Sequence, residues 1–194
     1  LLGEPGANKA FQSTIPNGES AVTALAVSGN GVLVGGTTAI RGKSPWLFTF
    51  NNKENIVAEK NLLNLAALLP GEKSVSSLVK AADGNVYGAT NNYYDIDYNY
   101  EEDWRAQKYA GGCIFKTEVT ETGVPSLKSY PPLFSNEGIV TLSASKDGWK
   151  LYGVTVPSQI LFSFDIKSGM VKEIARLGLL GVTYHRFTGK ATRE

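Results

Sequence analysis

Three stretches of this chain share one pattern, in which a turn is followed by a short apolar strand that ends in Thr. They are residues 31–37, 83–90 and 147–155, and the clearest reads Asp83-Gly84-Asn85-Val86-Tyr87-Gly88-Ala89-Thr90. An apolar pair with Val-x-x-Leu spacing precedes each stretch, and the pairs begin at Val22, Val75 and Ile139, which are 53 and 64 residues apart. A pattern that recurs at this spacing predicts a repeat protein.

Each repeat contains four segments that predict short antiparallel strands joined by turn residues. In the first repeat they are residues 22–27, 32–36, 46–50 and 56–60, and the third and fourth strands of the later repeats are expected at 113–117, 126–130, 160–165 and 170–175. Four strands in a repeat of roughly 40 to 50 residues are typical of a β-propeller blade. We predict an all-β fold, a single β-propeller-like domain over residues 1–194 with four-stranded blades at 22–69, 75–134 and 139–180. A generic β-sandwich is the alternative.

The segment at residues 61–69 is ambiguous. Its leucines have helical spacing and Pro70-Gly71 follows them, which favours a short helix, although a buried strand edge or a loop fits equally well.

Three repeats are fewer than the four or more blades of a closed propeller. The chain is therefore expected to be a fragment, to complete a ring with another copy, or to build a further blade from its ends. In the last case residues 182–187 would pair beside residues 10–15.

Composition excludes several classes of protein. Lys and Arg number 19 against 18 Asp and Glu, which gives a net charge of +1. The basic residues are scattered singly along the sequence and form no basic patch, so no nucleic-acid partner is expected. No apolar run is long enough for membrane insertion. The single cysteine, Cys113, excludes an intrachain disulfide and a multi-cysteine metal site, and its place at a strand start predicts a buried thiol.

The second repeat resembles a known family. Residues 83–90, followed after a variable loop by Gly111-Gly112-Cys113-Ile114-Phe115-Lys116, are similar to the bacterial repeat with consensus Asp-Gly-x-Leu-Tyr-Gly-Thr-Thr and then Gly-Thr-Val-Phe. That family occurs as tandem, propeller-like repeats in large exported proteins. The resemblance implies a propeller fold and an extracellular or periplasmic location, but no single chemistry, and the first and third repeats depart from the consensus.

The second repeat also carries an insertion, residues 91–112, between its second and third strands. This insertion is rich in aromatic residues interleaved with acidic ones, and the aromatic residues are Tyr93, Tyr94, Tyr98, Tyr100, Trp104 and Tyr109. Exposed Tyr and Trp offer flat apolar surface with a polar tip, which suits a glycan or a protein partner. In propellers such a loop shares a face with the connections between blades, where ligands usually bind. The alternative is that these aromatic residues pack back onto their own blade.

A weak calcium pattern lies within the same insertion. Asp95, Asp97 and Asn99 alternate as in the start of a calcium loop, but Tyr100 stands where such loops need Gly and Ala106 stands where they need Glu. No cofactor other than this calcium is expected.

The candidate catalytic residues are Tyr184, His185 and Arg186. A His or Tyr base beside a cation suits a polysaccharide lyase, but alternate residues of a strand point to opposite faces, so the three side chains are not expected to converge. The sequence therefore favours an exported binding or interaction module for a glycan or protein partner. A carbohydrate-active propeller enzyme and a purely structural repeat are the alternatives.

Overall fold

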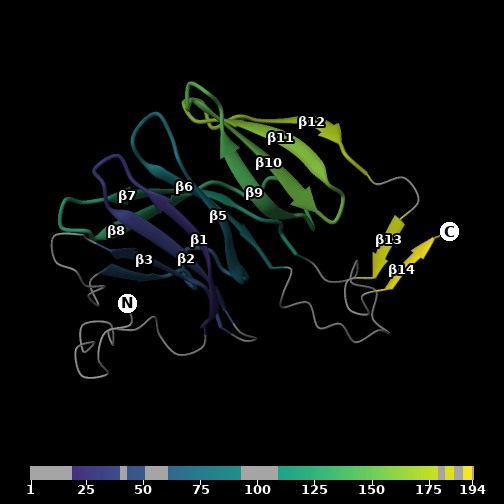
Figure 1. The fold of residues 1–194 in the computed structure, drawn as a ribbon, viewed down its shortest axis with the longest axis horizontal. Coiled ribbons are helices and arrows are strands. Elements are labelled where there is room, and N and C mark those ends of the chain that lie inside the picture. Colours follow the sequence, from purple (N-terminus) through teal and green to yellow (C-terminus); the bar gives the residue numbers. More distant parts are fainter. Residues whose placement is uncertain are drawn as a thin grey trace, which may run out of the picture.

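Every regular element of the described chain is a β-strand (Figure 1). The structure is a computed structural model that describes residues 19–39, 43–50, 61–92, 109–178, 182–185 and 190–193. Blade 1 comprises β1 (Glu19–Val27), β2 (Leu33–Ala39), β3 (Trp46–Phe50) and β4 (Leu62–Asn64). Blade 2 comprises β5 (Ser74–Lys80), β6 (Val86–Asn91), β7 (Ile114–Val119) and β8 (Pro125–Ser129). Blade 3 comprises β9 (Gly138–Ala144), β10 (Lys150–Val156), β11 (Ile160–Asp165) and β12 (Val171–Arg176).

Within each blade the four strands pair antiparallel in chain order. Blades 1 and 2 are joined by one bridge between β2 and β5, Thr38 to Ser74, so they count as a single eight-stranded sheet, while blade 3 is separate. The predicted propeller-type, all-β architecture is confirmed.

The ambiguous segment at residues 61–69 forms no helix. Its first part is β4, which pairs with β3 through Leu62, Leu63 and Asn64, and the chain then turns from Leu65 to Gly71. The strand expected at residues 56–60 lies outside the described residues, and β4 is the strand that pairs with the outer side of β3.

Near the C-terminus β13 (Val182–His185) pairs with β14 (Lys190–Arg193) in a two-stranded hairpin. The expected partner of this segment, residues 10–15, lies outside the described residues.

The turn between the first two strands of blade 2 is closed by its own side chains. The Oδ1 atom of Asp83 accepts the backbone N–H of Asn85 at 3.1 Å, and Gly84 has φ of +79°, a conformation that favours glycine. This turn also contacts both neighbouring blades. The Gly29 N–H donates to the Gly84 carbonyl at 2.7 Å, and the Ala82 N–H donates to the Gly148 carbonyl at 3.0 Å. The Asp-Gly motif therefore sets a turn and also connects successive blades.

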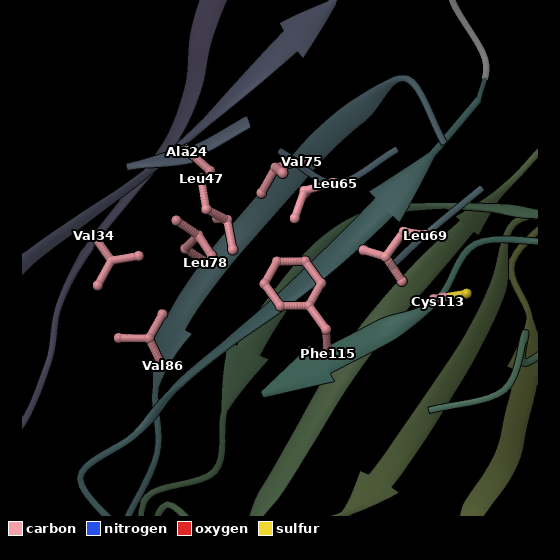
Figure 2. Close-up of a cluster of buried hydrophobic side chains, with 10 residues drawn as sticks. All are labelled: Ala24, Val34, Leu47, Leu65, Leu69, Val75, Leu78, Val86, Cys113 and Phe115. Atoms are coloured by element: carbon pink, nitrogen blue, oxygen red, sulfur yellow. The ribbon is translucent and has the colours of Figure 1, made fainter. Parts of the chain in front are cut away.

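The apolar core consists of two clusters, one between each pair of neighbouring blades. The first lies between blades 1 and 2, where Val34 and Leu47 face Leu78, Val86 and Phe115 (Figure 2). The second lies between blades 2 and 3 and is built around the following buried side chains: Tyr87, Ile114, Ile139, Leu142, Leu151, Phe162 and Phe164. Each blade thus buries its apolar faces only by stacking on another blade.

A Gly on the second strand lies under a Phe on the third strand in every blade. In blade 2, a Cβ atom added to Gly88 would lie 2.0 Å from Cζ of Phe115, its cross-strand partner. The same pairing joins these residues in the other blades: Gly35 with Phe48, and Gly153 with Phe162. The recurring glycine therefore provides the space in which the aromatic ring lies flat on the sheet.

Candidate ligand pocket

A pocket of about 590 Å³ opens at the end of blade 2 that carries the insertion. Its walls come from four segments, the β4–β5 connection, the insertion, the β8–β9 connection and, through Pro157, the β10–β11 connection. Apolar residues form much of the wall, and those with the largest side chains are Leu68, Leu69, Pro70, Tyr109, Tyr130, Pro131, Pro132 and Pro157. The predicted arrangement, in which the insertion shares a face with the connections between blades, is what the described residues show.

A glutamate recurs beside this end of each blade, where a threonine at the end of the second strand binds it. This glutamate is buried in blades 2 and 3 and half-buried in blade 1. In blade 3 the Thr155 hydroxyl donates to Glu137 at 2.6 Å and accepts the Ile160 N–H at 3.1 Å. The corresponding pairs are Thr37 with Glu19 in blade 1 and Thr90 with Glu72 in blade 2. The Thr–Glu pair is therefore a structural element of the repeat, because it ties the second strand to the start of the first and to the third.

In blade 2 the glutamate of this pair, Glu72, is also part of the pocket wall. The Tyr109 hydroxyl donates to both carboxylate oxygens of Glu72, at 3.0 and 2.9 Å, and the backbone of Asn92 hydrogen-bonds the same hydroxyl. Both Asn92 and Tyr109 belong to the insertion, Asn92 near its start and Tyr109 near its end. Glu72 and Tyr109 thus hold together the two ends of the insertion.

The exit of the insertion is also fixed to the β8–β9 connection. The Tyr109 N–H donates to Oδ1 of Asn136 at 3.1 Å, and the Asn136 N–H donates to the Tyr109 carbonyl at 3.0 Å. The Gly112 N–H donates to the Glu137 carbonyl at 2.7 Å. These bonds give the pocket one wall with a defined geometry.

Burial changes the protonation of this cluster. Glu72 is buried, and the loss of solvent raises the pKa of its carboxyl group to about 7, against the opposing effect of hydrogen bonds from Thr90 and Tyr109. Burial and the nearby Glu72 also raise the pKa of the Tyr109 hydroxyl far above its usual range. The Cys113 thiol is buried, as predicted, and burial raises its pKa to about 12, so it is not an activated nucleophile.

One polar atom in the pocket wall has no partner in the described chain. The side-chain oxygen of Asn92 is buried and accepts no hydrogen bond there. A buried acceptor without a donor costs about 1 to 3 kcal/mol. Asn92 therefore leaves an unsatisfied hydrogen-bond acceptor beside the pocket.

Of the six aromatic residues predicted to bind a ligand, Tyr109 falls within the described chain, and it lines the pocket. The other five, Tyr93, Tyr94, Tyr98, Tyr100 and Trp104, lie outside the described residues, as do the calcium candidates Asp95, Asp97 and Asn99. Tyr184 and His185 lie on β13 and Arg186 lies outside the described residues. Among the described residues, no group of three or more His, Cys, Asp or Glu side chains is arranged to hold a metal ion.

Sequence reasoning missed Glu72, Asn92 and Asn136. A signal for Glu72 was present, because a Glu stands three residues before both Val22 and Val75 and two residues before Ile139. Asn92 and Asn136 carry no such signal, since they become pocket residues only through the packing of connections that are distant in the sequence.

Comparison with solved structures supports the fold. The chain is similar to the β-propeller domain of Cps50 (Swd1) from Myceliophteria thermophila, with a TM-score of 0.53 and 12% identity over 81% of this chain and 44% of that one. It is also similar to Kuenenia stuttgartiensis hydrazine synthase, with a TM-score of 0.50 and 12% identity over 74% of this chain and 39% of that one. A third match is the extracellular domain of a hybrid two-component system from B. thetaiotaomicron, with a TM-score of 0.47 and 16% identity over 78% of this chain and 16% of that one.

No family model and no curated protein matches the chain. Within the described residues, no helix has the length and apolar character needed to span a membrane. The chain spans less than half the length of each of the three structures, and identities this low show the fold alone. The likeness to the Cps50 (Swd1) β-propeller domain therefore supports a fold made of β-propeller blades.

Proposed function

We propose that this protein is a β-propeller binding module that takes a glycan in the pocket beside the insertion. The observation that carries the proposal is the unpartnered, buried side-chain oxygen of Asn92 in the wall of a concave pocket. Pockets of about 300 to 1,000 Å³ with mainly apolar walls and a few polar groups are the usual sites for small ligands.

The chemistry of the wall suits a sugar. Tyr109, Tyr130 and neighbouring prolines supply apolar surface against which the C–H face of a sugar ring can pack, while Asn92 and Asn136 supply amide groups for its hydroxyls. The described part of the wall includes no Lys, Arg or His, so its polar groups favour neutral hydroxyls over an anionic group. A projecting side chain of a protein partner is the alternative occupant.

Titration calorimetry with neutral oligosaccharides tests the proposal. Asn92→Ala is expected to weaken binding about tenfold, the equivalent of one lost hydrogen bond. Thr122→Ala, on the β7–β8 turn at the opposite end of blade 2, is the matched control and is expected to leave affinity unchanged. If no oligosaccharide binds, the glycan assignment is wrong. If binding is found and Asn92→Ala leaves it unchanged, the pocket assignment is wrong.

We also propose that the protein is exported. The similarity of residues 83–90 and 111–116 to a repeat of exported bacterial proteins supports this location. Detection of the protein exclusively in the cytoplasmic fraction of its native cells would contradict it.

A further inference from the structure

Blades 1 and 3 each have one face that no other blade of the described chain covers. Blade 2 lies between blades 1 and 3, and both of its faces are covered by the two core clusters (Figure 1). The remaining face of blade 1 and the remaining face of blade 3 can be compared with the corresponding faces of blade 2, because equivalent positions are defined by strand register.

On blade 1 the uncovered face is marked by Leu25. This residue pairs with the strand glycine of β2, as Leu78 pairs with that of β6 and Leu142 with that of β10. Leu78 and Leu142 are 9% and 7% exposed because each packs against the preceding blade, whereas Leu25 is 56% exposed. Val22 is 46% exposed, while its equivalents in blades 2 and 3 are fully buried. Phe48, on the same face and farther from the innermost strand, is 8% exposed. The innermost strand of blade 1 therefore presents the residues of a blade interface without a neighbouring blade in the described chain.

On blade 3 the uncovered face is marked by Tyr152. Its equivalents directly before the strand glycine are Val34 and Tyr87, which are buried against the following blade. Tyr152 is instead 40% exposed. Leu161 on the adjacent strand is half-buried, whereas both its equivalents are fully buried. This face has the residues that blades 1 and 2 use to pack on a following blade.

The turns show the same complementarity. In the two existing junctions, an N–H in the turn of one blade donates to the carbonyl of the turn glycine in the following blade, at 2.7 and 3.0 Å. In the terminal blades the corresponding groups are the N–H of Lys146 and the carbonyl of Gly31. A third junction of the same kind would join blade 3 to blade 1.

We infer that two copies of this chain close a six-bladed ring, in which blade 3 of each copy packs on blade 1 of the other. Propellers typically contain about 4 to 8 blades, so the three described blades are too few to close a ring and six are enough. A two-fold axis makes the two new junctions identical, which gives a closed dimer. This inference rests on the faces of blades 1 and 3 and is independent of the glycan proposal.

The new junction would differ from the existing ones in one respect. Thr23 and Ser76 lie at a bulge of the innermost strand and donate to carbonyls of the following blade, at 2.7 and 2.6 Å. The equivalent residue of blade 3 is Val140, which is exposed and cannot donate. At the ring junction an apolar contact would replace this hydrogen bond, and Val22 of the other copy supplies the facing apolar residue.

Light scattering coupled to gel filtration tests the inference on the full chain. The expected mass is twice the 20.8 kDa of one chain. Leu25→Glu and Tyr152→Lys are each expected to yield monomer, because every ring of one variant contains two damaged junctions. Met170→Glu, at an exposed position in the β11–β12 turn, is the control and should remain dimeric.

A mixture of the two variants provides the decisive measurement. A dimer of one Leu25→Glu chain and one Tyr152→Lys chain has one unaltered junction and one junction with opposite charges, so the mixture is expected to recover the dimeric mass. A monomeric wild-type chain at about 100 μM would overturn the inference and would indicate that blades of another chain or chain segment cover these faces. Open-ended oligomers, or a dimer that both single variants leave intact, would also overturn it.

Discussion

Replacing Glu72 by Gln should stabilise the protein at alkaline pH and leave its stability almost unchanged at acidic pH. Glu72 is buried, and in the described chain its hydrogen-bond donors are neutral hydroxyls. Its ionised form is therefore stabilised less in the folded protein than in water. Gln has the shape of the protonated acid and retains an oxygen that can accept from Tyr109, but it carries no charge at any pH.

The size of the effect follows from the pKa of Glu72, which burial raises from 4.5 to about 7. A carboxyl group whose pKa is raised by folding binds its proton more tightly in the folded state. Its contribution to stability is therefore complete below pH 4.5 and is lost as the pH rises through 7. Because each pKa unit corresponds to about 1.4 kcal/mol, ionisation of Glu72 destabilises the folded protein by about 3 kcal/mol at pH 8.

Thermal unfolding of the wild type and of Glu72→Gln at pH 5 and pH 8 measures this difference. The variant is expected to melt about 6 to 12 °C higher than the wild type at pH 8, and within about 2 °C of it at pH 5. Both proteins are compared at one chain concentration, because self-association shifts the melting temperature.

Glu137→Gln is the matched control for Glu72→Gln. Glu137 accepts the hydroxyl of Thr155 and the backbone N–H of Ser158, and one amide oxygen cannot replace both carboxylate oxygens. This control is expected to lose stability at both pH values. A Glu72→Gln variant with the same stability difference at pH 5 and pH 8 would refute the reasoning from burial.

Three further predictions concern the scaffold. Gly88→Ala should destabilise the protein by about 1 to 3 kcal/mol or more in urea unfolding, because the new methyl group would collide with the fully buried ring of Phe115. Its control is Gly178→Ala, whose new methyl group meets no atom within 4 Å and should change stability by less than about 0.5 kcal/mol. Thr155→Val should cost about 1 to 3 kcal/mol in the same assay, since it leaves a buried carboxylate and a strand N–H without their shared hydroxyl. Cys113 should react with a thiol reagent at pH 8 only after denaturation, and rapid labelling of the native protein would contradict its burial.

Local signals in the sequence predicted the blades well. The third strand of blade 1, β3 (Trp46–Phe50), and the third strand of blade 3, β11 (Ile160–Asp165), have the predicted bounds. Turn residues and short apolar runs define such strands because each lies between two turns. The position of the insertion between the second and third strands of blade 2 also followed from the repeat.

The fourth strand of blade 1 could not be located in this way. Leucines at the spacing found in residues 61–69 fit one side of a short helix as well as a buried strand followed by a turn. What decides the outcome is the pairing of Leu62–Asn64 with β3 and the burial of Leu65 and Leu69 against blade 2, as Figure 2 shows. Contacts of this kind depend on the stacking of blades, which no local pattern encodes.

Glu72 shows why a site on a repeat scaffold is difficult to find from residue types. A lone Glu is most simply interpreted as a solvated charge, but the Thr–Glu pair recurs in all three blades, so its primary role is structural. Blade 2 differs because the insertion places Tyr109 on this pair and leaves the side-chain oxygen of Asn92 without a hydrogen-bond partner in the described chain. The pocket is thus built by adding one loop to a position that every blade already holds rigid. Ionisation of Glu72 should for this reason affect the stability of the pocket wall and the scaffold together.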